Sequence, residues 1–261
     1  MIKNILKKII PFALLSYLRK KRQGIRKREV VLKEENSNEF ILRKNFYAQF
    51  LRPGDIYFDI GANYGNRIAP IQKIGMGLII AVEPQVGCCE YLKDRYKDIT
   101  VLQKGVGASA GSAKFYISND TVLSSFSNDF IAKTSNTRFT ENSWENTAEV
   151  DIITLDSLIA EYGIPDFIKI DVEGFETEVF KGLNRKVKMI SFEYTVPELA
   201  DNLLPILTKA NSLGECMFNF SVGESMQFDM KEWISFESIK SFIITDEFIK
   251  TGFGDIYIKY V

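Results

Sequence analysis

Three acidic residues stand where buried strands are expected to end. Asp171 closes the apolar stretch 167–171, Glu173 follows in the next turn, and Glu193 ends the stretch 189–194 in "ISFEY". Because the carboxyl ends of parallel strands meet at one edge of a sheet, these side chains should face one crevice. The chain has no histidine, so a catalytic base here would be a carboxylate. We interpret Asp171, Glu173 and Glu193 as candidate catalytic residues.

The same acids have simpler explanations that the residues alone leave open. Acids near a helix N-terminus stabilise the helix, which is the better explanation for Glu176 and an alternative for Asp171. Glu193 could instead pair with a lysine at the rim of the crevice. Carboxylates without histidine or paired cysteines suit Mg²⁺ or Ca²⁺ rather than zinc. The sequence does not decide whether a metal binds.

The stretch "DIGANYG", from Asp59 to Gly65, follows an apolar strand and opens a predicted helix. Gly61 and Gly65 allow a tight turn and a close approach of a ligand to the backbone. The free N–H groups of the helix N-terminus can bind a carboxylate or a phosphate. Glu83 ends the next strand, eighteen residues after Gly65, where a carboxylate accepts hydrogen bonds from a ribose diol. Together these features indicate an adenosine-bearing cofactor.

The glycine spacing distinguishes between such cofactors. The NAD fingerprint is G-x-G-x-x-G, whereas this turn has G-x-x-x-G, with Asn63 in the place of the second glycine. A tail with a carboxylate and an ammonium group suits Asp59, Asn63 and the helix N-terminus better than a pyrophosphate does. We therefore predict S-adenosylmethionine. The alternatives are NAD or another nucleotide, and a tight turn without a ligand.

The elements that must position these residues alternate between strands and helices. Strands are predicted at 56–60, 78–82, 100–103, 167–171, 189–194 and 255–260, and helices at 65–74, 88–96, 155–162, 174–181 and 198–212. Short apolar strands alternating with helices indicate an α/β fold with a parallel sheet covered on both faces. Residues 29–54 read as helical, and 112–118 and 148–154 as an additional strand pair. The segment 119–147 is rich in Ser, Asn and Thr and is predicted to be a long surface loop or lid.

Several of these stretches together resemble the FkbM-type methyltransferase family. The matching pieces are "DIGANYG", "AVEP" at 81–84, "ITLDSLIAEYGI" at 153–164, "IKIDVEGFETEVFKG" at 168–182, "ISFEY" at 190–194 and "GFGDIYIKY" at 252–260. The resemblance covers roughly 55–260 and implies a class I methyltransferase fold. That fold is Rossmann-like and doubly wound, with a mostly parallel seven-stranded sheet whose last strand is antiparallel.

The resemblance also implies S-adenosylmethionine as methyl donor and O-methylation of a hydroxyl, on a sugar of a bacterial glycan or on a polyketide. Asp171 falls where the methyl group should point, Glu83 resembles the acid that binds the ribose, and Gly105 with Val106 occupies the adenine edge. The implied cofactor-binding residues are Asp59, Gly61, Ala62, Asn63, Gly65, Asn66, Glu83, Pro84, Gly105 and Val106. An NAD-dependent oxidoreductase on a similar sheet is the alternative from another class, but its glycine fingerprint is missing. The N-terminal segment and 119–147 are not family-defining.

Composition limits the partners. The 261 residues carry 33 basic and 34 acidic side chains, so the formal net charge is −1 and no nucleic-acid partner is expected. Three cysteines without metal-ligand spacing fit a reducing cytoplasm. Residues 29–261 are expected to form one domain.

The segment 1–28 interleaves apolar residues with lysines and ends in a basic run. Its longest apolar run is too short to span a bilayer. It is predicted either to lie on an anionic membrane at the cytoplasmic inner face, or to pack on the domain as a helix.

Overall fold

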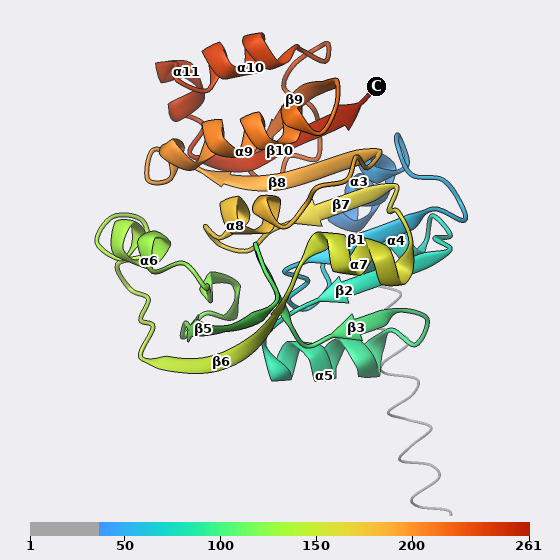
Figure 1. Cartoon of the computed structure of the whole chain (residues 1–261), viewed down its shortest axis with the longest axis vertical. Coiled ribbons are helices and arrows are strands. Elements are labelled where there is room, and N and C mark those ends of the chain that lie inside the picture. Colours follow the sequence, from blue (N-terminus) through green and yellow to red (C-terminus); the bar gives the residue numbers. More distant parts are fainter. Residues whose placement is uncertain (1–36) are drawn as a thin grey trace, which may run out of the picture.

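The computed structural model describes residues 37–261 (Figure 1). The predicted membrane-binding segment 1–28, and the first part of the predicted helical stretch 29–54, lie outside these residues. Within the described part of the stretch, helix α3 covers Asn38–Tyr47. It begins at the N-cap Ser37, whose hydroxyl accepts a hydrogen bond from the Phe40 N–H at 3.1 Å.

In the described residues the main sheet has seven strands in the order β3-β2-β1-β7-β8-β10-β9. Their bounds are β1 Ile56–Ile60, β2 Leu78–Val82, β3 Thr100–Leu102, β7 Phe167–Ile170, β8 Met189–Thr195, β9 Cys216–Val222 and β10 Phe253–Tyr260. The strands β1, β2, β3, β7 and β8 pair in parallel, and β10 runs antiparallel to both β8 and β9. This is the doubly wound class I methyltransferase sheet that was predicted, including its antiparallel last strand.

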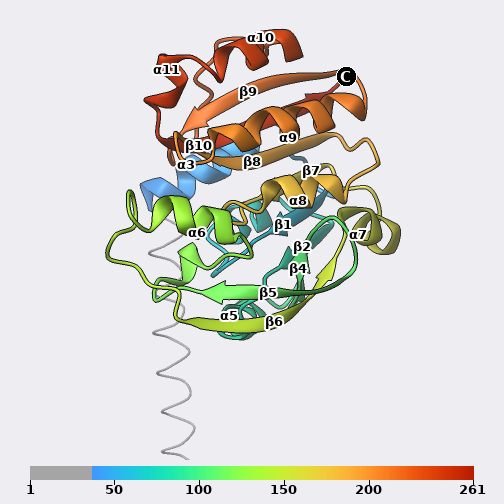
Figure 2. The same ribbon diagram turned by 60° about the vertical axis from the view of Figure 1, so that its left-hand side comes forward.

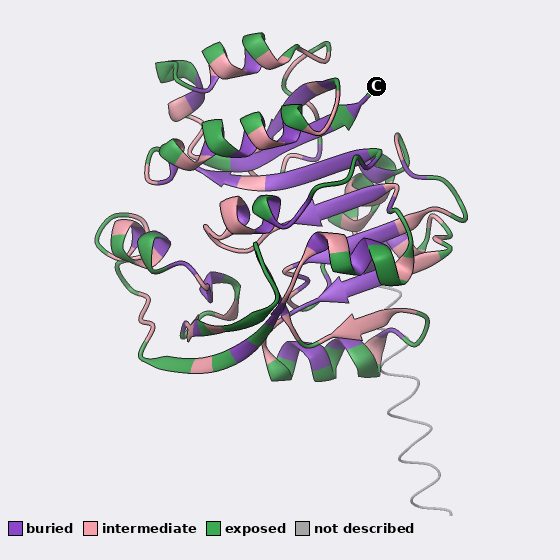
Figure 3. Cartoon of the chain, in the orientation of Figure 1, coloured by how far each residue is buried: buried purple, intermediate pink, exposed green. Residues whose placement is uncertain are grey.

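Helices cover both faces of this sheet, because alternate residues of each strand point to opposite sides. Phe58 and Ile60 belong to the core cluster that includes residues of α7 to α10, whereas Tyr57 belongs to the cluster that includes residues of α3, α4 and α5. The bounds are α4 Ile68–Gln72, α5 Val86–Arg95, α7 Leu155–Tyr162, α8 Glu176–Lys181, α9 Ala200–Ser212, α10 Phe236–Phe242 and α11 Asp246–Ile249. Figure 3 shows the strands mostly buried and the outer helix faces exposed.

The chain runs from β1 outward to β3 and then returns to β7, which lies beside β1. The strand order therefore reverses between β1 and β7, and ligands of open α/β sheets bind at the carboxyl ends of strands at such a point. This topology brings the "DIGANYG" turn, which follows β1, next to the acids that follow β7.

A smaller sheet stands beside the main one, in the order β4-β6-β5. Its strands are β4 Gly105–Val106, β5 Gly111–Ile117 and β6 Asn146–Ile153. Strands β5 and β6 form the predicted additional pair, and they run antiparallel. Figure 2 shows β5 and β6 running side by side below helix α6, which covers Asn128–Thr134.

The segment 119–147, predicted to be a long surface loop or lid, is not a loop throughout. The segment contains the 3₁₀ turn η2 at Thr121–Leu123 as well as α6, and Phe130 is fully buried. Arg138 donates hydrogen bonds to the Val196 and Gly252 carbonyls at 2.8 and 3.1 Å. Phe130 and the arginine therefore fix the segment to the domain.

Sequence reasoning also missed β9, α10 and α11. Strand β9 has the sequence "CMFNFSV", in which Asn219 and Ser221 interrupt the apolar run. Both polar side chains are buried, and Asn219 donates to the Met230 carbonyl at 3.0 Å, which compensates its burial. No helix among residues 37–261 is both long and apolar enough to cross a bilayer.

Candidate active site

A cavity of about 310 Å³ opens at the carboxyl ends of β1 and β7. It brings together nearly all of the residues singled out from the sequence. They are Asp59, Gly61, Ala62, Asn63, Asn66, Glu83, Pro84, Gly105 and Val106 from the predicted cofactor site, and Asp171, Glu173 and Glu193 from the predicted catalytic set. Gly65 does not line this cavity. It lies against Leu92 of α5 and against Tyr96, the residue that follows α5.

The turn after β1 depends on Gly61. Its N–H donates to the Val82 carbonyl at 2.9 Å, and its φ is +85°, a value that L side chains rarely adopt. A Cβ at this position would lie 1.7 Å from the carbonyl oxygen of Asp171. Glycine is therefore required because the backbones after β1 and β7 nearly touch. At Gly65 the constraint is packing, since a Cβ would lie 2.7 Å from the Leu92 side chain.

Glu83 is held by two backbone groups. Its carboxylate accepts hydrogen bonds from the Asn63 N–H and the Gln85 N–H, both at 2.8 Å. The residue is 2% exposed, and burial raises the pKa of its carboxyl group. Each carboxylate oxygen has a further lone pair, so Glu83 can accept hydrogen bonds from two ribose hydroxyls while it keeps both backbone contacts.

Asp59 lies on β1 opposite Lys169 of β7. It is 2% exposed, and burial raises the pKa of its carboxyl group to about 6. A buried acid on the wall of the cofactor cavity suits the ammonium group of the methionine tail, because a nearby cation offsets the cost of burying the carboxylate.

The three predicted catalytic acids converge. Asp171, Glu173 and Glu193 each offer an oxygen, and these oxygens lie within 4.8 Å of one another. Burial raises the pKa values of Glu173 and Glu193 well above the ordinary value, and the charge of Asp171 raises them further. Glu173 adopts φ +51°, a left-handed conformation that is unfavourable for a non-glycine residue. Two of the three acids, Glu173 and Glu193, thus have raised pKa values, and one of them lies at an unusual turn, as is often found at functional sites.

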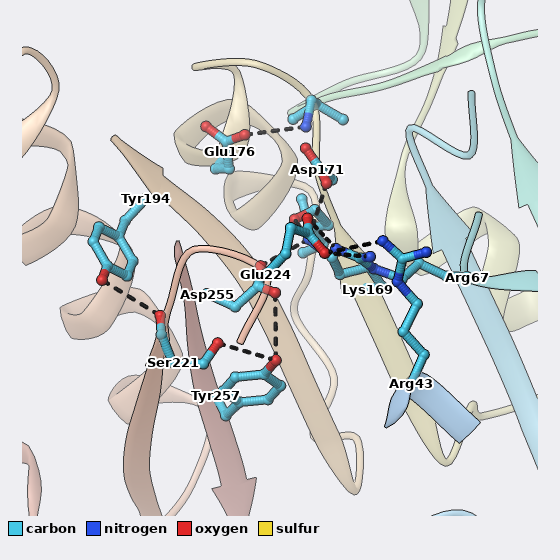
Figure 4. Close-up of polar contacts among 12 residues, drawn as sticks. Arg43, Arg67, Lys169, Asp171, Glu176, Tyr194, Ser221, Glu224, Asp255 and Tyr257 are labelled. Carbon is cyan, nitrogen blue, oxygen red and sulfur yellow. Dashed lines mark hydrogen bonds and ion pairs between the residues drawn. The ribbon is translucent and has the colours of Figure 1, made fainter. Parts of the chain in front are cut away.

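Lys169 connects this group to the antiparallel strand (Figure 4). Its ammonium lies 3.1 Å from Asp171 Oδ2 and 2.8 Å from Asp255 Oδ1, and the side chain is 1% exposed. Although burial alone would lower the pKa of Lys169, Asp171 and Asp255 raise it well above the ordinary value. Lys169 was not predicted as a site residue, although a lysine inside the apolar strand "FIKI" was a signal that could have been followed.

Glu176 has the structural role that was expected as the simpler explanation. It is the first residue of α8, and its carboxylate accepts hydrogen bonds from the Val172 and Gly174 N–H groups at 3.1 and 3.3 Å. Burial raises the pKa of this carboxyl group to about 7. Glu176 thus shapes the turn that carries Glu173.

Arg43, Arg67 and Glu224 also line the cavity, and sequence reasoning missed them. Arg67 Nη1 and Nη2 each lie 2.6 Å from a Glu224 oxygen, and Arg43 Nη2 lies 3.4 Å from Glu224 Oε2. Burial would raise the pKa of Glu224, but its hydrogen bonds and charge contact with Arg67 lower it to about 2. The three residues come from α3, the turn before α4 and the loop after β9. No local spacing could have grouped them.

The geometry places the predicted cofactor turn, the predicted ribose-binding acid Glu83 and the three carboxylates in one cavity. The profile of the Methyltransferase FkbM domain matches residues 59–232 of the chain, which is more than half of its length. The chain belongs to the FkbM methyltransferase family. It is accordingly an S-adenosylmethionine-dependent methyltransferase, as the resemblance implied. The matched residues include the whole segment 119–147, so that segment lies inside the family's domain.

Solved structures that are similar to this FkbM methyltransferase include three with low sequence identity. A TehB-like SAM-dependent methyltransferase from Corynebacterium glutamicum is 11% identical with a TM-score of 0.45, and the match covers 94% of this chain and 99% of that one. The plantazolicin methyltransferase BpumL, in complex with SAH, is 11% identical with a TM-score of 0.39 over 93% and 90% of the two chains. Precorrin-6y C5,15-methyltransferase from Geobacter metallireducens is 12% identical with a TM-score of 0.39 over 84% and 86%. No curated protein matches the chain.

Proposed function

We propose that this FkbM methyltransferase methylates a hydroxyl oxygen of a sugar, in a bacterial surface glycan or in its lipid-linked precursor. The observation that carries the proposal is the convergence of Asp171, Glu173 and Glu193 in the cavity that also contains the cofactor turn and Glu83. An alcohol must lose its proton as it attacks a methyl group, and carboxylates are the bases that this cavity offers. Family membership favours the methyltransferase over the NAD-dependent oxidoreductase that the sheet alone also allowed.

In the proposed reaction the acceptor oxygen attacks the methyl carbon in line with the sulfur. The new O–C bond forms as the C–S bond breaks, and the electron pair of that bond returns to sulfur, which gives S-adenosylhomocysteine. The hydroxyl proton moves to a carboxylate of the acidic group. The contribution of the chain is to hold the two reacting atoms in this alignment and to provide the base.

Asp171 is the strongest candidate for that base. Its backbone carbonyl almost touches Gly61 of the cofactor turn, so its side chain starts beside the donor. Glu173 and Glu193 lie beside it, since one carboxylate oxygen from each of the three residues lies within 4.8 Å of the others.

The same three carboxylates could hold Mg²⁺ or Ca²⁺, since these ions prefer oxygen ligands. Activity after treatment with EDTA distinguishes the two roles. Activity that disappears with the chelator and returns with added Mg²⁺ or Ca²⁺ would mean that the carboxylates act through a metal ion. Activity that persists would support direct proton transfer to a carboxylate.

A transfer assay tests the acceptor. The protein is incubated with S-adenosylmethionine labelled in its methyl group and with nucleotide-activated sugars, lipid-linked oligosaccharides or a hydroxylated polyketide. The proposal expects a labelled methyl ether on a sugar. Transfer only to the polyketide would contradict the sugar acceptor and favour the polyketide, the other acceptor class that the family resemblance implied. Transfer only to a nitrogen or carbon atom would contradict O-methylation.

For the segment 1–28 we propose contact with the inner face of an anionic membrane, which would place the enzyme beside lipid-linked acceptors. Each basic residue near such a surface contributes about 1 kcal/mol, and insertion of apolar side chains adds to this. In a flotation assay the full chain should float with anionic vesicles, detach at high salt, and stop floating without residues 1–28. If the full chain did not float with vesicles at any salt concentration, this contact would be contradicted.

A further inference from the structure

The segment between β5 and α6 forms part of the cofactor cavity, although nothing in the proposed reaction gives it a role. Thr121, Val122, Ser124 and Phe126 line the same cavity as Glu83 and Val106. They lie within six consecutive residues of the chain, so together they form one side of the cavity. We call residues 121–126 the 121–126 wall.

Hydrogen bonds fix the 121–126 wall to the strand end that carries the ribose acid. The Gln85 side chain donates through Nε2 to the Thr121 carbonyl at 3.0 Å, and Gln85 Oε1 accepts from the Ser124 hydroxyl at 3.4 Å. The Ser124 hydroxyl in turn accepts from the Ser118 N–H at 3.0 Å. Because Gln85 follows Glu83 by two residues, the wall has a fixed position relative to the predicted ribose contact.

Phe126 is the aromatic member of the wall. A Cβ on Gly105 would lie 2.5 Å from Phe126 Cζ, so the absence of a side chain at Gly105 makes room for this ring. The Phe126 centroid lies 4.7 Å from that of Phe115 and 5.4 Å from that of Phe175. The residue is only half-buried despite these neighbours, so part of it faces open space in the cavity.

We infer that the 121–126 wall binds the adenine ring of the cofactor, and that Phe126 stacks on its face. Glu83 is placed to hold the ribose, and the methionine tail must lie toward Gly61, because Asp171 and the acidic group are on that side. The base then extends from the ribose in the other direction, toward Val106 and the 121–126 wall. A flat aromatic base is best matched there by an aromatic side chain, since both present π-faces.

This inference rests on the S-adenosylmethionine site of the proposed function and not on the acceptor. It assigns the segment that was predicted to be a lid to cofactor binding, and it accounts for Gly105 as packing space for Phe126 rather than as a direct contact of adenine. An alternative role, as a wall of the acceptor site, predicts a different outcome in the following experiment.

The test uses isothermal titration of the full chain with S-adenosylhomocysteine and with 5′-methylthioadenosine, which has adenine and ribose but no amino-acid tail. Phe126→Leu keeps an apolar side chain but removes the aromatic face. It should weaken both ligands about 10-fold, within the range reported for loss of base stacking. Phe126→Tyr keeps the ring and should retain the affinity of the unmodified chain for both.

Phe139→Leu is the matched control. Phe139 belongs to the same stretch between β5 and β6 but packs against the cluster of Leu123, Phe130 and Leu199. It should bind both ligands within about 2-fold of the unmodified chain, a change that corresponds to less than about 0.5 kcal/mol. Unfolding curves of every variant show whether a loss of affinity reflects a loss of folded protein.

If folded Phe126→Leu bound both ligands with unchanged affinity, the inference would be overturned, and the alternative role of the 121–126 wall in the acceptor site would be favoured. An equal loss in Phe139→Leu would also overturn it, because the effect would then reflect general loosening of the segment. If the unmodified chain bound neither ligand, the cofactor assignment itself would fail. That result is distinct from a failure confined to Phe126.

Discussion

The two ends of the cavity are lined by different kinds of groups. At the end that is predicted to bind the cofactor, which we call the cofactor end, the lining comes from backbone turns and from Glu83, whose two oxygens already accept hydrogen bonds from the Asn63 and Gln85 N–H groups. At the acidic end they come from side chains, and Glu173 and Glu193 have pKa values raised well above the ordinary value by burial and by Asp171. The first end is preorganised with its hydrogen bonds already made, whereas the second holds acids whose charged forms are costly.

This difference separates binding from chemistry. A site whose groups are already held by hydrogen bonds should bind its ligand with little rearrangement, because those groups lose little conformational entropy on binding. Buried acids with raised pKa values, such as Glu173 and Glu193, are typical of sites that transfer protons. We therefore expect substitutions at the cofactor end to change affinity, and substitutions at the acidic end to change turnover.

The largest effect should come from Asp171→Asn. If Asp171 is the base, the rate constant of methyl transfer should fall by about 10²–10⁴-fold, while the affinity for S-adenosylhomocysteine stays within about 3-fold. Single-turnover kinetics and titration measure the two quantities separately. Asp201→Asn, an exposed acid on α9, is the control. Normal turnover in Asp171→Asn would move the base to Glu173 or Glu193, and Glu173→Gln and Glu193→Gln would then be compared.

The second effect concerns stability against pH. Burial raises the pKa of Glu176 from its ordinary 4.5 to about 7, so the folded protein holds this proton more tightly than the unfolded chain does. The resulting stabilisation is complete below about pH 4.5 and is lost as the pH rises toward about 7. Glu176→Gln cannot ionise but can still accept the hydrogen bonds from Val172 and Gly174.

The free energy of unfolding of the unmodified chain should therefore fall between pH 5 and pH 8, and Glu176→Gln should reduce this fall by on the order of 2 kcal/mol. Denaturant titrations at the two pH values measure it. Glu178→Gln on the same helix, where Glu178 pairs with Lys181 at the surface, should leave the fall unchanged. An identical fall in both variants would mean that Glu176 does not carry this proton.

The third effect is on cofactor affinity. Glu83→Ala removes the carboxylate that is predicted to bind the ribose and leaves the Asn63 and Gln85 N–H groups without their acceptor. The affinity for S-adenosylhomocysteine should fall at least about 10-fold, with turnover at saturating S-adenosylmethionine reduced less than the affinity. Glu90→Ala, an exposed residue of α5, is the control in the same titration. Unchanged affinity in Glu83→Ala would remove the ribose assignment and with it the contrast between the two ends.

The sequence was informative about strands and their tips, because local signals define both. The apolar stretch before "DIGANYG" and the acids after the next strands gave the parallel sheet and the carboxylate group, since parallel strands must place their carboxyl ends together. Asn219 and Ser221 concealed β9, because their burial depends on partners elsewhere in the fold. The order of the strands follows from pairing across more than 100 residues, as between β1 and β7, and here it was implied only by the family resemblance.

The remaining site residues were unpredictable for the same reason. Arg43 and Glu224 meet across 181 positions, and their contact depends on the packing of α3 beside the loop after β9. The segment 119–147 looked like a loop because its composition is polar. Its serines and asparagines are in fact used for caps and for hydrogen bonds to the rest of the domain, as at Ser127 and Ser124. Composition alone does not distinguish a solvated polar side chain from one that holds a turn in place.

Ser125 is where the two ends of the cavity are physically joined. It belongs to the 121–126 wall, yet its hydroxyl donates to the Glu173 carbonyl at 2.6 Å and accepts from the Ser127 N–H at 2.8 Å. The Glu173 backbone has the unfavourable φ of +51°, so a bond that holds its carbonyl helps to keep this turn in position. Although Ser125 lies in a segment assigned to the cofactor, we expect its removal to act on the acidic end.

Ser125→Ala should lower the rate constant of methyl transfer about 5-fold, which corresponds to the loss of one hydrogen bond worth about 1 kcal/mol. Its affinity for S-adenosylhomocysteine should stay within about 2-fold, because the lining residues Thr121, Val122 and Phe126 are unchanged. Ser127→Ala is the matched control: it removes the N-cap of α6, where Ser127 accepts from the Phe130 N–H at 3.1 Å. That variant should lose about 1 kcal/mol of stability and keep the rate. If Ser125→Ala instead weakened binding and left the rate intact, the wall would serve the cofactor alone, and the proposed link between the two ends would be wrong.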